Sequence, residues 1–363
     1  MSEPGIKVTT YFGEREREGG RFLADALFDV YERHGMRTSV LLRGVEGFGE
    51  RHRLQTDRLL TLSESLPVVS VAIDTRDRIE AAVPEVLEVA RHGLTTLERA
   101  RLATGDGLAG LVLPDPPRAL ALKLTVYGGR GVRTGGEAGY VAAVDLLRAA
   151  GADGASVLLG VDGTLHGGRR RARFFARNAG VPLMLLSIGS RNSLQAALPL
   201  LSRLLEDPVI TIERVQICKA AGRLLAEPDP VAGRDASGLP IWQKLMVHVE
   251  EQAKHDGHPV HVQLVRRLRE AGAAGATVLR GVRGFYGEHE PFADRLLSVR
   301  RNVPVTVVAI DTPAGVRRWW PIVDEVTAEA GLVTSELVPA SHGLGAEDRL
   351  ALPLAATPTS ELG

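Results

Sequence analysis

The sequence predicts an α+β protein built from three copies of one βαββαβ unit, closed on itself as a single-chain pseudo-trimer. Three observations predict this architecture: an internal repeat, the same order of strand-like and helix-like segments in every copy, and strands that are apolar on both faces. The chain has 363 residues, a length that suffices for two or three domains of ordinary size.

The repeat shows as marker residues that keep their spacing in three successive stretches of the chain. A short alternating strand ends at Tyr11, Tyr127 and His248, so the copies are offset by 116 and 121 residues. A glycine follows 24 residues after each of these positions, and a second glycine follows nine residues later. A fixed period of this kind indicates repeated structural units. The markers are Gly35, Gly151 and Gly272; Gly44, Gly160 and Gly281; Pro67, Pro182 and Pro304; Pro84, Pro199 and Pro321; and Glu98, Glu213 and Glu336.

The same register divides the chain into domains. We expect the copies at residues 1–103, 121–219 and 242–340, with linkers at 104–120 and 220–241 and a tail at 341–363. The linkers are rich in Gly, Pro, Ala and Asp, as connecting segments are. The second copy is the most diverged.

Each copy has the order strand, helix, strand, hairpin loop, strand, helix, strand. The first helix has an apolar stripe of helical period that begins with Leu23 and Leu27. The second helix is predicted to begin after Thr75, Ser190 or Thr312, whose hydroxyl can accept a hydrogen bond from an unpaired helix N–H. With both helices amphipathic, this order predicts a ferredoxin-like sandwich of helices on an antiparallel sheet.

The second and third strands of a copy are apolar on both sides, as in residues 40–42 and 68–73. A lone unit would leave one sheet face exposed, whereas three sheets that face one another would bury it. Linkers of about 3.3 Å per extended residue are long enough to join neighbours in a ring. We therefore expect a monomer that mimics a homotrimer; three separate beads on a string are the alternative.

Composition limits the classes of partner and the compartment. Lys+Arg and Asp+Glu both number 44, so no overall field attracts nucleic acid or an anionic membrane. The single cysteine, Cys218, fits a reducing compartment. The start lacks a signal-peptide pattern, and no apolar run approaches the roughly 20 residues that span a bilayer. We expect a cytoplasmic protein that is not membrane-embedded and does not bind nucleic acid.

Three short segments of copy one carry a resemblance to a known family. SVLLRGVEGFG (39–49), LPVV (66–69) and IDT (73–75) resemble an uncharacterised branch of the PII-like (GlnB-type) superfamily. Copy three matches through 276–287, whereas copy two keeps the spacing but has Leu159 in place of the arginine and Gly189 in place of the aspartate. Together the three copies cover about 290 residues.

The resemblance implies both an architecture and a function. Members are typically trimers of ferredoxin-like subunits that bind small effectors, often adenine nucleotides, in the clefts between subunits. A long hairpin loop contacts a protein target, and the relatives of this branch often lie beside fluoride-channel genes. The resemblance therefore implies a small-molecule effector, with an adenine nucleotide as one candidate, and a protein target such as a membrane transporter or ion channel.

Two arginines stand at the end of a core strand and before a Gly-x-x-Gly motif. A guanidinium beside backbone N–H groups that only glycine brings close could bind an anion. Alternatively, the glycines shape a hairpin and each arginine pairs with a nearby aspartate, which in turn assists a helix cap. The candidate ligand-binding residues are Arg43, Gly44, Gly47 and Asp74 in copy one, and Arg280, Gly281, Gly284 and Asp311 in copy three.

Other motifs give weaker candidates. The basic hairpin loop of copy two, with Arg169, Arg170 and Arg171, is a candidate contact for a protein partner, although a basic run is usually a solvated face. The glycine-rich loop at 128–136 fails the dinucleotide spacing. The histidines at 248, 255, 258 and 261 do not follow a recognised metal-ligand pattern, so we predict no metal site. No catalytic arrangement is visible, and we predict that the protein is not an enzyme.

These observations favour a signal-transduction protein. A small, anionic ligand is predicted to bind in clefts between copies, and the loops near 44–62, 160–178 and 281–299 to report it to a protein partner. Because copy two diverges, the clefts are expected to be unequal. The alternatives are a cation-binding tolerance protein of CutA-like architecture and an enzyme that acts at a cleft between copies.

Overall fold

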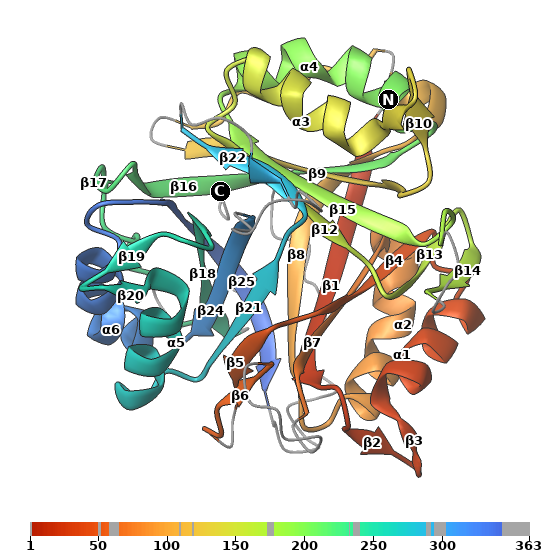
Figure 1. The fold of residues 1–363 in the computed structure, drawn as a ribbon. Coiled ribbons are helices and arrows are strands. Elements are labelled where there is room, and N and C mark those ends of the chain that lie inside the picture. The colour runs from red at the N-terminus through yellow and green to blue at the C-terminus, as the bar shows by residue number, and fades with distance from the viewer. Residues whose placement is uncertain are drawn as a thin grey trace.

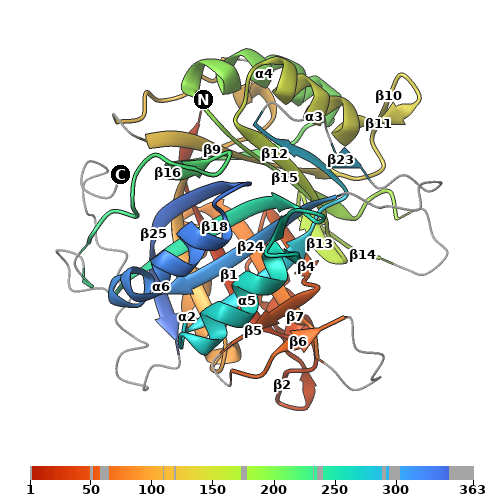
Figure 2. The same cartoon turned by 60° about the vertical axis from the view of Figure 1, so that its left-hand side comes forward.

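A computed structural model describes residues 2–49, 52–57, 65–108, 110–117, 120–172, 178–231, 233–234, 240–287, 292–293 and 303–342. These residues form three units arranged around a common centre. Strands occupy the middle of the molecule, and each unit places its own pair of helices on the outside (Figure 1). The second view shows the same layering, with α5 and α6 covering the sheet of the third unit (Figure 2).

Repeat 1 is an antiparallel sheet with two helices on one face. Its strands lie in the order β4, β7, β1, β8, which is the ferredoxin-like arrangement. Its main elements are β1 (Glu3–Gly13), α1 (Leu23–Arg33), β4 (Thr38–Arg43), β7 (Pro67–Thr75), α2 (Arg76–Val89) and β8 (Leu94–Ala103). Its short strands are β2 (Arg17–Glu18), β3 (Arg21–Phe22), β5 (Glu46–Phe48) and β6 (Gln55–Thr56).

Repeats 2 and 3 have the same order of elements. Repeat 2 contains β9 (Leu120–Gly129), α3 (Gly139–Ala149), β12 (Gly154–Leu159), β15 (Pro182–Gly189), α4 (Arg191–Leu204) and β16 (Val209–Ala220), with short strands β10 (Arg133–Thr134), β11 (Glu137–Ala138), β13 (Asp162–Leu165), β14 (Gly168–Arg171) and β17 (Arg223–Leu224). Repeat 3 contains β18 (Ile241–Glu250), α5 (Val260–Glu270), β21 (Gly275–Arg280), β24 (Pro304–Asp311), α6 (Pro313–Val326) and β25 (Leu332–His342), with short strands β19 (Lys254–His255), β20 (His258–Pro259), β22 (Arg283–Tyr286) and β23 (Phe292–Ala293). The predicted α+β fold of three ferredoxin-like units is confirmed.

The second helix of each unit begins where the hydroxyl residues predict. Ser190 accepts a hydrogen bond from the Ser193 N–H, and Thr312 accepts one from the Gly315 N–H, both at 3.1 Å. Thr75 occupies the same cap position, but its side chain makes no capping bond. Two of the three predicted caps therefore use the hydroxyl as expected.

The three units close into a ring through two sets of strand pairs. The hairpin strand of each repeat pairs with the second strand of a neighbour: β13 with β4, β22 with β12, and β5 with β21. The last strands of the three repeats also pair with one another: β8 with β16, β16 with β25, and β25 with β8. Every repeat thus contacts both others, which confirms the predicted single-chain pseudo-trimer.

Burial explains why the ring closes. Each unit has its own core between its helices and its sheet, and a fourth apolar cluster joins the inner sheet faces of all three units. Leu42, Leu158 and Leu279, at matching positions of the three second strands, lie together in that shared cluster. The second apolar face that the sequence shows is therefore buried against its counterparts.

The described parts of the two connections contact the units that they join. In the first, Leu111 and Leu113 are buried, and the Gln195 side chain of α4 hydrogen-bonds the backbone of both. In the second, Asp229 bonds the side chain of Gln216 in β16. Within the described part of the chain, no helix is both long and apolar enough to cross a membrane.

Candidate functional site

The structure places the two predicted arginines at strand ends, each engaged by carboxylates other than the expected ones. Arg43 ends β4, is half exposed, and lies 3.0 Å from Glu14. Arg280 ends β21 and lies 2.7 Å from Glu251 and 3.5 Å from Asp57 of repeat 1. The alternative in which these arginines pair with Asp74 and Asp311 is therefore not what the structure has.

The glycines of the Gly-x-x-Gly motif lie where strands of different repeats approach closely. A Cβ at Gly47 would stand 2.5 Å from the Ala276 carbonyl oxygen, and a Cβ at Gly284 would stand 2.3 Å from that of Ala155. Gly44 and Gly281 are similarly crowded by Pro67 and Pro304 and by a neighbouring backbone. These glycines therefore permit the hairpin strand to cross the boundary between repeats. This role agrees with the alternative in which the glycines shape a hairpin rather than an anion site.

Asp74 and Asp311 are buried and serve the backbone of their own repeat. Asp74 accepts hydrogen bonds from the N–H groups of Arg37 and Thr75, at 2.7 and 2.8 Å. Asp311 accepts one from the Thr312 N–H at 2.7 Å and one from the Trp319 indole at 2.9 Å. Both carboxylates tie the start of the second helix to the loop before the second strand, which agrees with the capping alternative.

The arginines of the basic hairpin of repeat 2 largely contact repeat 1. Arg169 lies 2.8 Å from Asp162 and 3.3 Å from Asp25 of α1, and its guanidinium stands 4.9 Å from the centre of the Phe28 ring. Arg171 also reaches Asp25, at 3.1 Å. Arg170 is exposed. Two of the three predicted partner contacts therefore take part in a boundary between repeats.

Other predicted features are separated or lie outside the described residues. In the described part of the chain, the histidines at 255, 258 and 261 do not form a cluster of metal-ligand geometry. His248 is fully buried in β18, with Nδ1 3.2 Å from the Thr306 hydroxyl. Parts of the predicted reporting loops, including residues 58–62, 173–177 and 294–299, and the tail from 343 onward lie outside the described residues.

A cavity of about 510 Å³, which we call the 1–3 cleft, lies between repeats 1 and 3. Repeat 1 supplies the end of β1 and the loop after β5, and repeat 3 supplies the first residues of β21 and part of β24. Its floor is apolar, with Ala276, Val308 and Ile310. The volume lies within the range of small-molecule sites.

The wall that repeat 1 contributes to the 1–3 cleft is basic and aromatic. Arg15, Arg17, Arg53 and His92 bring positive or protonatable groups to it. Its rings include Tyr11, Phe12 and Phe48, and His52 stacks on Phe48 with ring centres 5.8 Å apart. Glu16 is also present, but one of its oxygens accepts the Gly13 N–H at 2.7 Å. The arrangement suits an anion attached to a flat or apolar group.

A second feature lies where the three sheets meet. Six buried charged residues, which we call the axial ring, form a closed cycle of alternating lysines and glutamates. Each lysine of the first strand stands opposite the glutamate of the last strand in its own repeat. The members are Lys7, Lys123, Lys244, Glu98, Glu213 and Glu336.

Ion pairs join the members of the axial ring across the repeats. Within repeats, the ammonium–carboxylate distance is 2.7 Å for Lys7–Glu98, 3.1 Å for Lys123–Glu213 and 3.3 Å for Lys244–Glu336. Between repeats, Lys7 pairs with Glu213, Lys123 with Glu336, and Lys244 with Glu98 at 2.7 Å. Three positive and three negative charges therefore neutralise one another away from water.

The protonation of the ring follows from these pairs. Burial would lower the pKa of Lys7, but the carboxylates of Glu213 and Glu98 raise it well above its ordinary value. Burial would likewise raise the pKa of Glu98, but Lys244, Lys7 and Lys123 hold it well below its usual range. The pKa of Glu336 is lowered for the same reason. Lys244 differs, because burial lowers its pKa more than the carboxylates of Glu336 and Glu98 raise it. The ion pairs therefore favour the charged forms of Lys7, Glu98 and Glu336.

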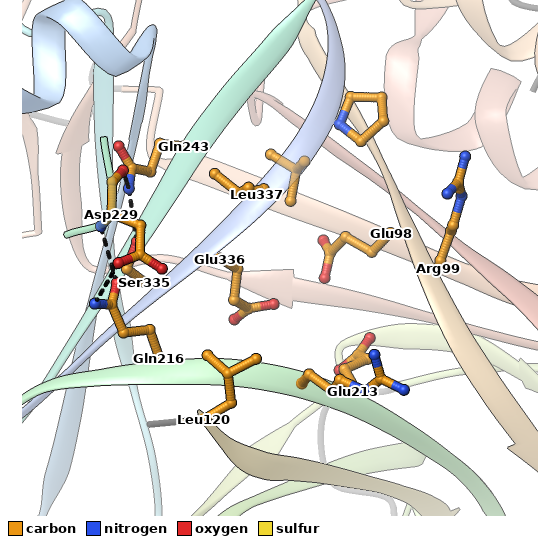
Figure 3. A pocket seen from close by; sticks show the side chains of 13 residues that line it. Glu98, Arg99, Leu120, Glu213, Gln216, Asp229, Gln243, Ser335, Glu336 and Leu337 are labelled. Atoms are coloured by element: carbon orange, nitrogen blue, oxygen red, sulfur yellow. Dashed lines mark hydrogen bonds between the residues drawn. The ribbon is translucent and has the colours of Figure 1, made fainter. Parts of the chain in front are cut away.

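A cavity of about 170 Å³ opens beside the axial ring (Figure 3). Gln216, Gln243 and Ser335 line it, and Asp229 of the second connection closes one side through its bonds to Gln216. The three glutamates bring one carboxylate oxygen each within 4.8 Å of the others, a spacing that could hold a cation. The paired lysines already balance the charge of these carboxylates.

The prediction from sequence missed the axial ring. A signal was present, because the first strand of every copy carries a lysine and the last strand a glutamate, even in the diverged second copy. A charged residue retained three times at inward positions of apolar strands indicates a buried partner of opposite charge. The prediction also missed the 1–3 cleft residues, whose meeting depends on the contact between repeats 1 and 3.

Comparisons with known proteins agree with the repeat. A model of the DUF190 family, described as "Uncharacterized ACR, COG1993", matches residues 5–102, 121–217 and 242–340. Two proteins of Aquifex aeolicus (strain VF5), both named "UPF0166 protein", are similar to parts of the chain. One is 30% identical over 93 residues, which is 25% of this chain and 86% of the relative. The other is 29% identical over 80 residues, which is 22% of this chain and 82% of the relative.

The lengths of these matches indicate what differs between the proteins. Each relative is covered almost completely by a stretch no longer than one repeat, so each has the length of about one copy. The three matched stretches each coincide with one βαββαβ unit and together cover well over half of the sequence. The chain therefore belongs to the DUF190 family and carries the family's domain three times in tandem.

Proposed function

We propose that the protein is a PII-like regulatory protein that binds a small, anionic, ring-containing ligand in the 1–3 cleft. The observation that carries this proposal is the cavity of about 510 Å³ between repeats 1 and 3. Repeat 1 lines it with arginines and aromatic rings, and repeat 3 lines it with apolar side chains. An adenine nucleotide is the ligand class that the family resemblance favours. The protein binds this ligand as a signal and does not convert it.

The chemistry of the wall supports an anionic group on the ligand. Guanidinium groups bind phosphate and carboxylate oxygens with two parallel hydrogen bonds. Arg17 is held in place, since it donates to the Gly20 carbonyl oxygen at 2.8 Å and lies 4.2 Å from the Phe22 ring centre. A rigidly held arginine loses less conformational entropy when it binds an anion.

The position of the cleft supports a role in signalling. Gly49, Arg53 and Gln55 line it, and they belong to the hairpin that follows β5. A ligand in the cleft would contact this hairpin directly, so binding would favour one arrangement of the segment that leads into the loop after residue 57. We propose that this loop reports ligand to a protein partner, with a membrane transporter or ion channel as the candidate class.

Calorimetric titration of the purified chain with ATP, ADP and AMP tests the proposal. Arg53→Ala should weaken binding by about tenfold or more, because it removes a charge-assisted contact. Arg170→Ala removes an exposed arginine of repeat 2 and should leave the affinity unchanged. Absence of binding by all three nucleotides would remove the nucleotide as ligand, and release of product during the titration would favour an enzyme instead.

Among the residues that the structure describes, a cation-binding function has one candidate location, the three glutamates of the axial ring. Their lysine partners argue against it, because a bound cation would have to displace or repel three ammonium groups. Metal analysis of untagged protein after incubation with copper and zinc separates the two functions. Retained metal that is lost in Glu336→Gln would favour the cation-binding alternative.

A further inference from the structure

We infer that two of the three clefts between repeats are filled by the protein's own side chains, Leu165 and Tyr286, so that the 1–3 cleft is the one kept open. The sequence predicts unequal clefts because copy two diverges. The open cleft lies between copies one and three, and both filled clefts involve the diverged copy two. The inference rests on the proposed function only for the identity of the ligand.

The three hairpin strands place equivalent residues at the three boundaries. Phe48, Thr164 and Phe285 pair with the equivalent residues Ala276, Ser39 and Ala155 of the neighbouring repeat. The next residue along each hairpin therefore stands at the same place in each cleft. These residues are Gly49 at the 1–3 boundary, Leu165 at the boundary of repeats 1 and 2, and Tyr286 at the boundary of repeats 2 and 3.

Tyr286 occupies the cleft between repeats 2 and 3. It stands opposite Gly154, and a Cβ on that glycine would lie 2.8 Å from the Tyr286 ring. The ring centre is 5.4 Å from that of His248, and the side chain belongs to the shared apolar cluster. The corresponding glycine of repeat 3, Gly275, instead lines the 1–3 cleft. An aromatic ring therefore takes the space that is empty at the other boundary.

Leu165 has the same role between repeats 1 and 2. It pairs with Thr38 and packs against the shared apolar cluster. The next residues bring the hairpin across the opening: the His166 ring lies 2.9 Å from the Asp207 carbonyl oxygen, and the Gly167 N–H bonds the Arg37 carbonyl oxygen at 3.2 Å. This cleft is thus filled by a leucine and crossed by the hairpin backbone.

Gly49 leaves the third position vacant. A Cβ at Gly49 would meet no atom of the described residues within 4 Å. The first residue of the last strand in each repeat shows the same difference between the clefts. Leu94 at the 1–3 cleft is half-buried, whereas the equivalent Val209 and Leu332 are 0% and 2% exposed. Glycine at one boundary, and a large side chain at the other two, therefore decides where a ligand can enter.

Thiol labelling tests this inference without a ligand. Single cysteines at the three equivalent deep positions, Leu94→Cys, Val209→Cys and Leu332→Cys, would be treated with an aromatic disulfide reagent, with the wild-type chain as control for the buried Cys218. Leu94→Cys should react about tenfold faster or more than the other two, which become accessible only through local opening. Equal rates at all three positions would overturn the inference.

Two further variants exchange the side chains that fill the clefts. Gly49→Tyr should slow labelling of Leu94→Cys to the rate of the other two, and Tyr286→Gly should raise that of Leu332→Cys. If Tyr286→Gly fails to fold, Gly49→Tyr still decides, because it adds a side chain where the structure has open space. Unchanged labelling of Leu94→Cys in the Gly49→Tyr background would contradict the assigned role of residue 49.

Ligand stoichiometry separates this inference from the proposed function. Titration with ATP should give one site per chain, and Gly49→Tyr should abolish it. Three equal sites would overturn the inference and leave the proposed function standing. Absence of ATP binding with selective labelling of Leu94→Cys would remove the nucleotide from the proposed function and leave the inference standing.

Discussion

The axial ring and the three clefts are built from equivalent positions of the same three copies, yet they differ in how far the copies have diverged. The ring keeps a lysine and a glutamate in every copy, including the second. The clefts carry glycine, leucine and tyrosine at the position that decides their volume. The ring is one object shared by all copies, whereas each cleft belongs to one boundary only.

The physical reason lies in what a single change would do. Removing one charge from the ring leaves an opposite charge buried without its full set of partners, so the cost falls on the whole assembly. Filling one cleft with an apolar side chain buries more apolar surface and leaves the other two boundaries as they were. Three copies in one chain can therefore vary their clefts independently but must keep the ring intact.

Breaking the ring should have the largest effect. Lys123→Met leaves Glu213 and Glu336 short of an ammonium partner in the interior, and we expect a loss of about 3–5 kcal/mol in the free energy of unfolding. Urea unfolding would measure it. The double variant Lys123→Met with Glu336→Met restores neutrality and should recover part of the loss. A double variant less stable than the sum of both single changes would contradict the reading of the ring as a balanced set.

Crowding a boundary should have the next largest effect. Gly284→Ala places a Cβ 2.3 Å from the Ala155 carbonyl oxygen, so the strands β22 and β12 must separate. We expect destabilisation of about 1–3 kcal/mol. Gly49→Ala, where the added Cβ meets no atom of the part of the chain that the structure describes within 4 Å, is the matched control and should leave thermal unfolding unchanged. Similar losses in both variants would indicate that backbone freedom, not strand contact, selects these glycines.

The pH dependence of stability should distinguish His248, at the filled boundary between repeats 2 and 3, from the axial ring. Burial lowers the pKa of His248 to about 3 from its ordinary 6.5. Between these values the unfolded chain binds a proton that the native chain does not, so stability falls as the pH falls. Glu98 and Glu336 of the ring have lowered pKa values, and their contribution to stability is lost only at lower pH, as the pH falls through those values.

His248→Gln tests this assignment. In the wild-type chain, His248 should lower the free energy of unfolding by about 2 kcal/mol as the pH falls from 6.5 to 4.5, and the variant should lack this decrease. Urea unfolding at several pH values would measure it. Below that window both proteins should still lose stability, because the ring is intact in both. If the free energy of unfolding of the variant depends on pH above 4.5 as that of the wild-type chain does, other groups cause the acid sensitivity.

The smallest effect is expected at the arginine that the sequence first singled out. Arg43 is half exposed and pairs with Glu14, so Arg43→Ala should change the free energy of unfolding by less than about 1 kcal/mol. Since Arg43 does not line the 1–3 cleft, nucleotide affinity should also stay the same. An affinity loss as large as that of Arg53→Ala would instead favour the anion site predicted at the end of β4.

The pattern of residues predicted much of the fold and little of the candidate site. The N-cap hydroxyls of Ser190 and Thr312 and the apolar stripes are local signals, and local backbone physics decides what they form. The roles of Arg43 and Arg280 could not be read this way, because their partners, Glu14 and Asp57 among them, depend on how loops and neighbouring repeats pack. Likewise, Gly47 reads as a turn residue until the Ala276 backbone is known to lie against it.

By itself, the amino-acid sequence determined that the protein has three βαββαβ units and that their second sheet faces must be hidden from water. The periodic pattern of apolar residues reflects contacts within one copy, so it can be recognised in the sequence of one copy. The tertiary structure alone decided that Lys7 meets Glu213, that Gly49 faces open space, and that Tyr286 covers Gly154. Those contacts join residues from different thirds of the chain, and the distance between such residues is set by the closure of the ring rather than by their spacing along the sequence.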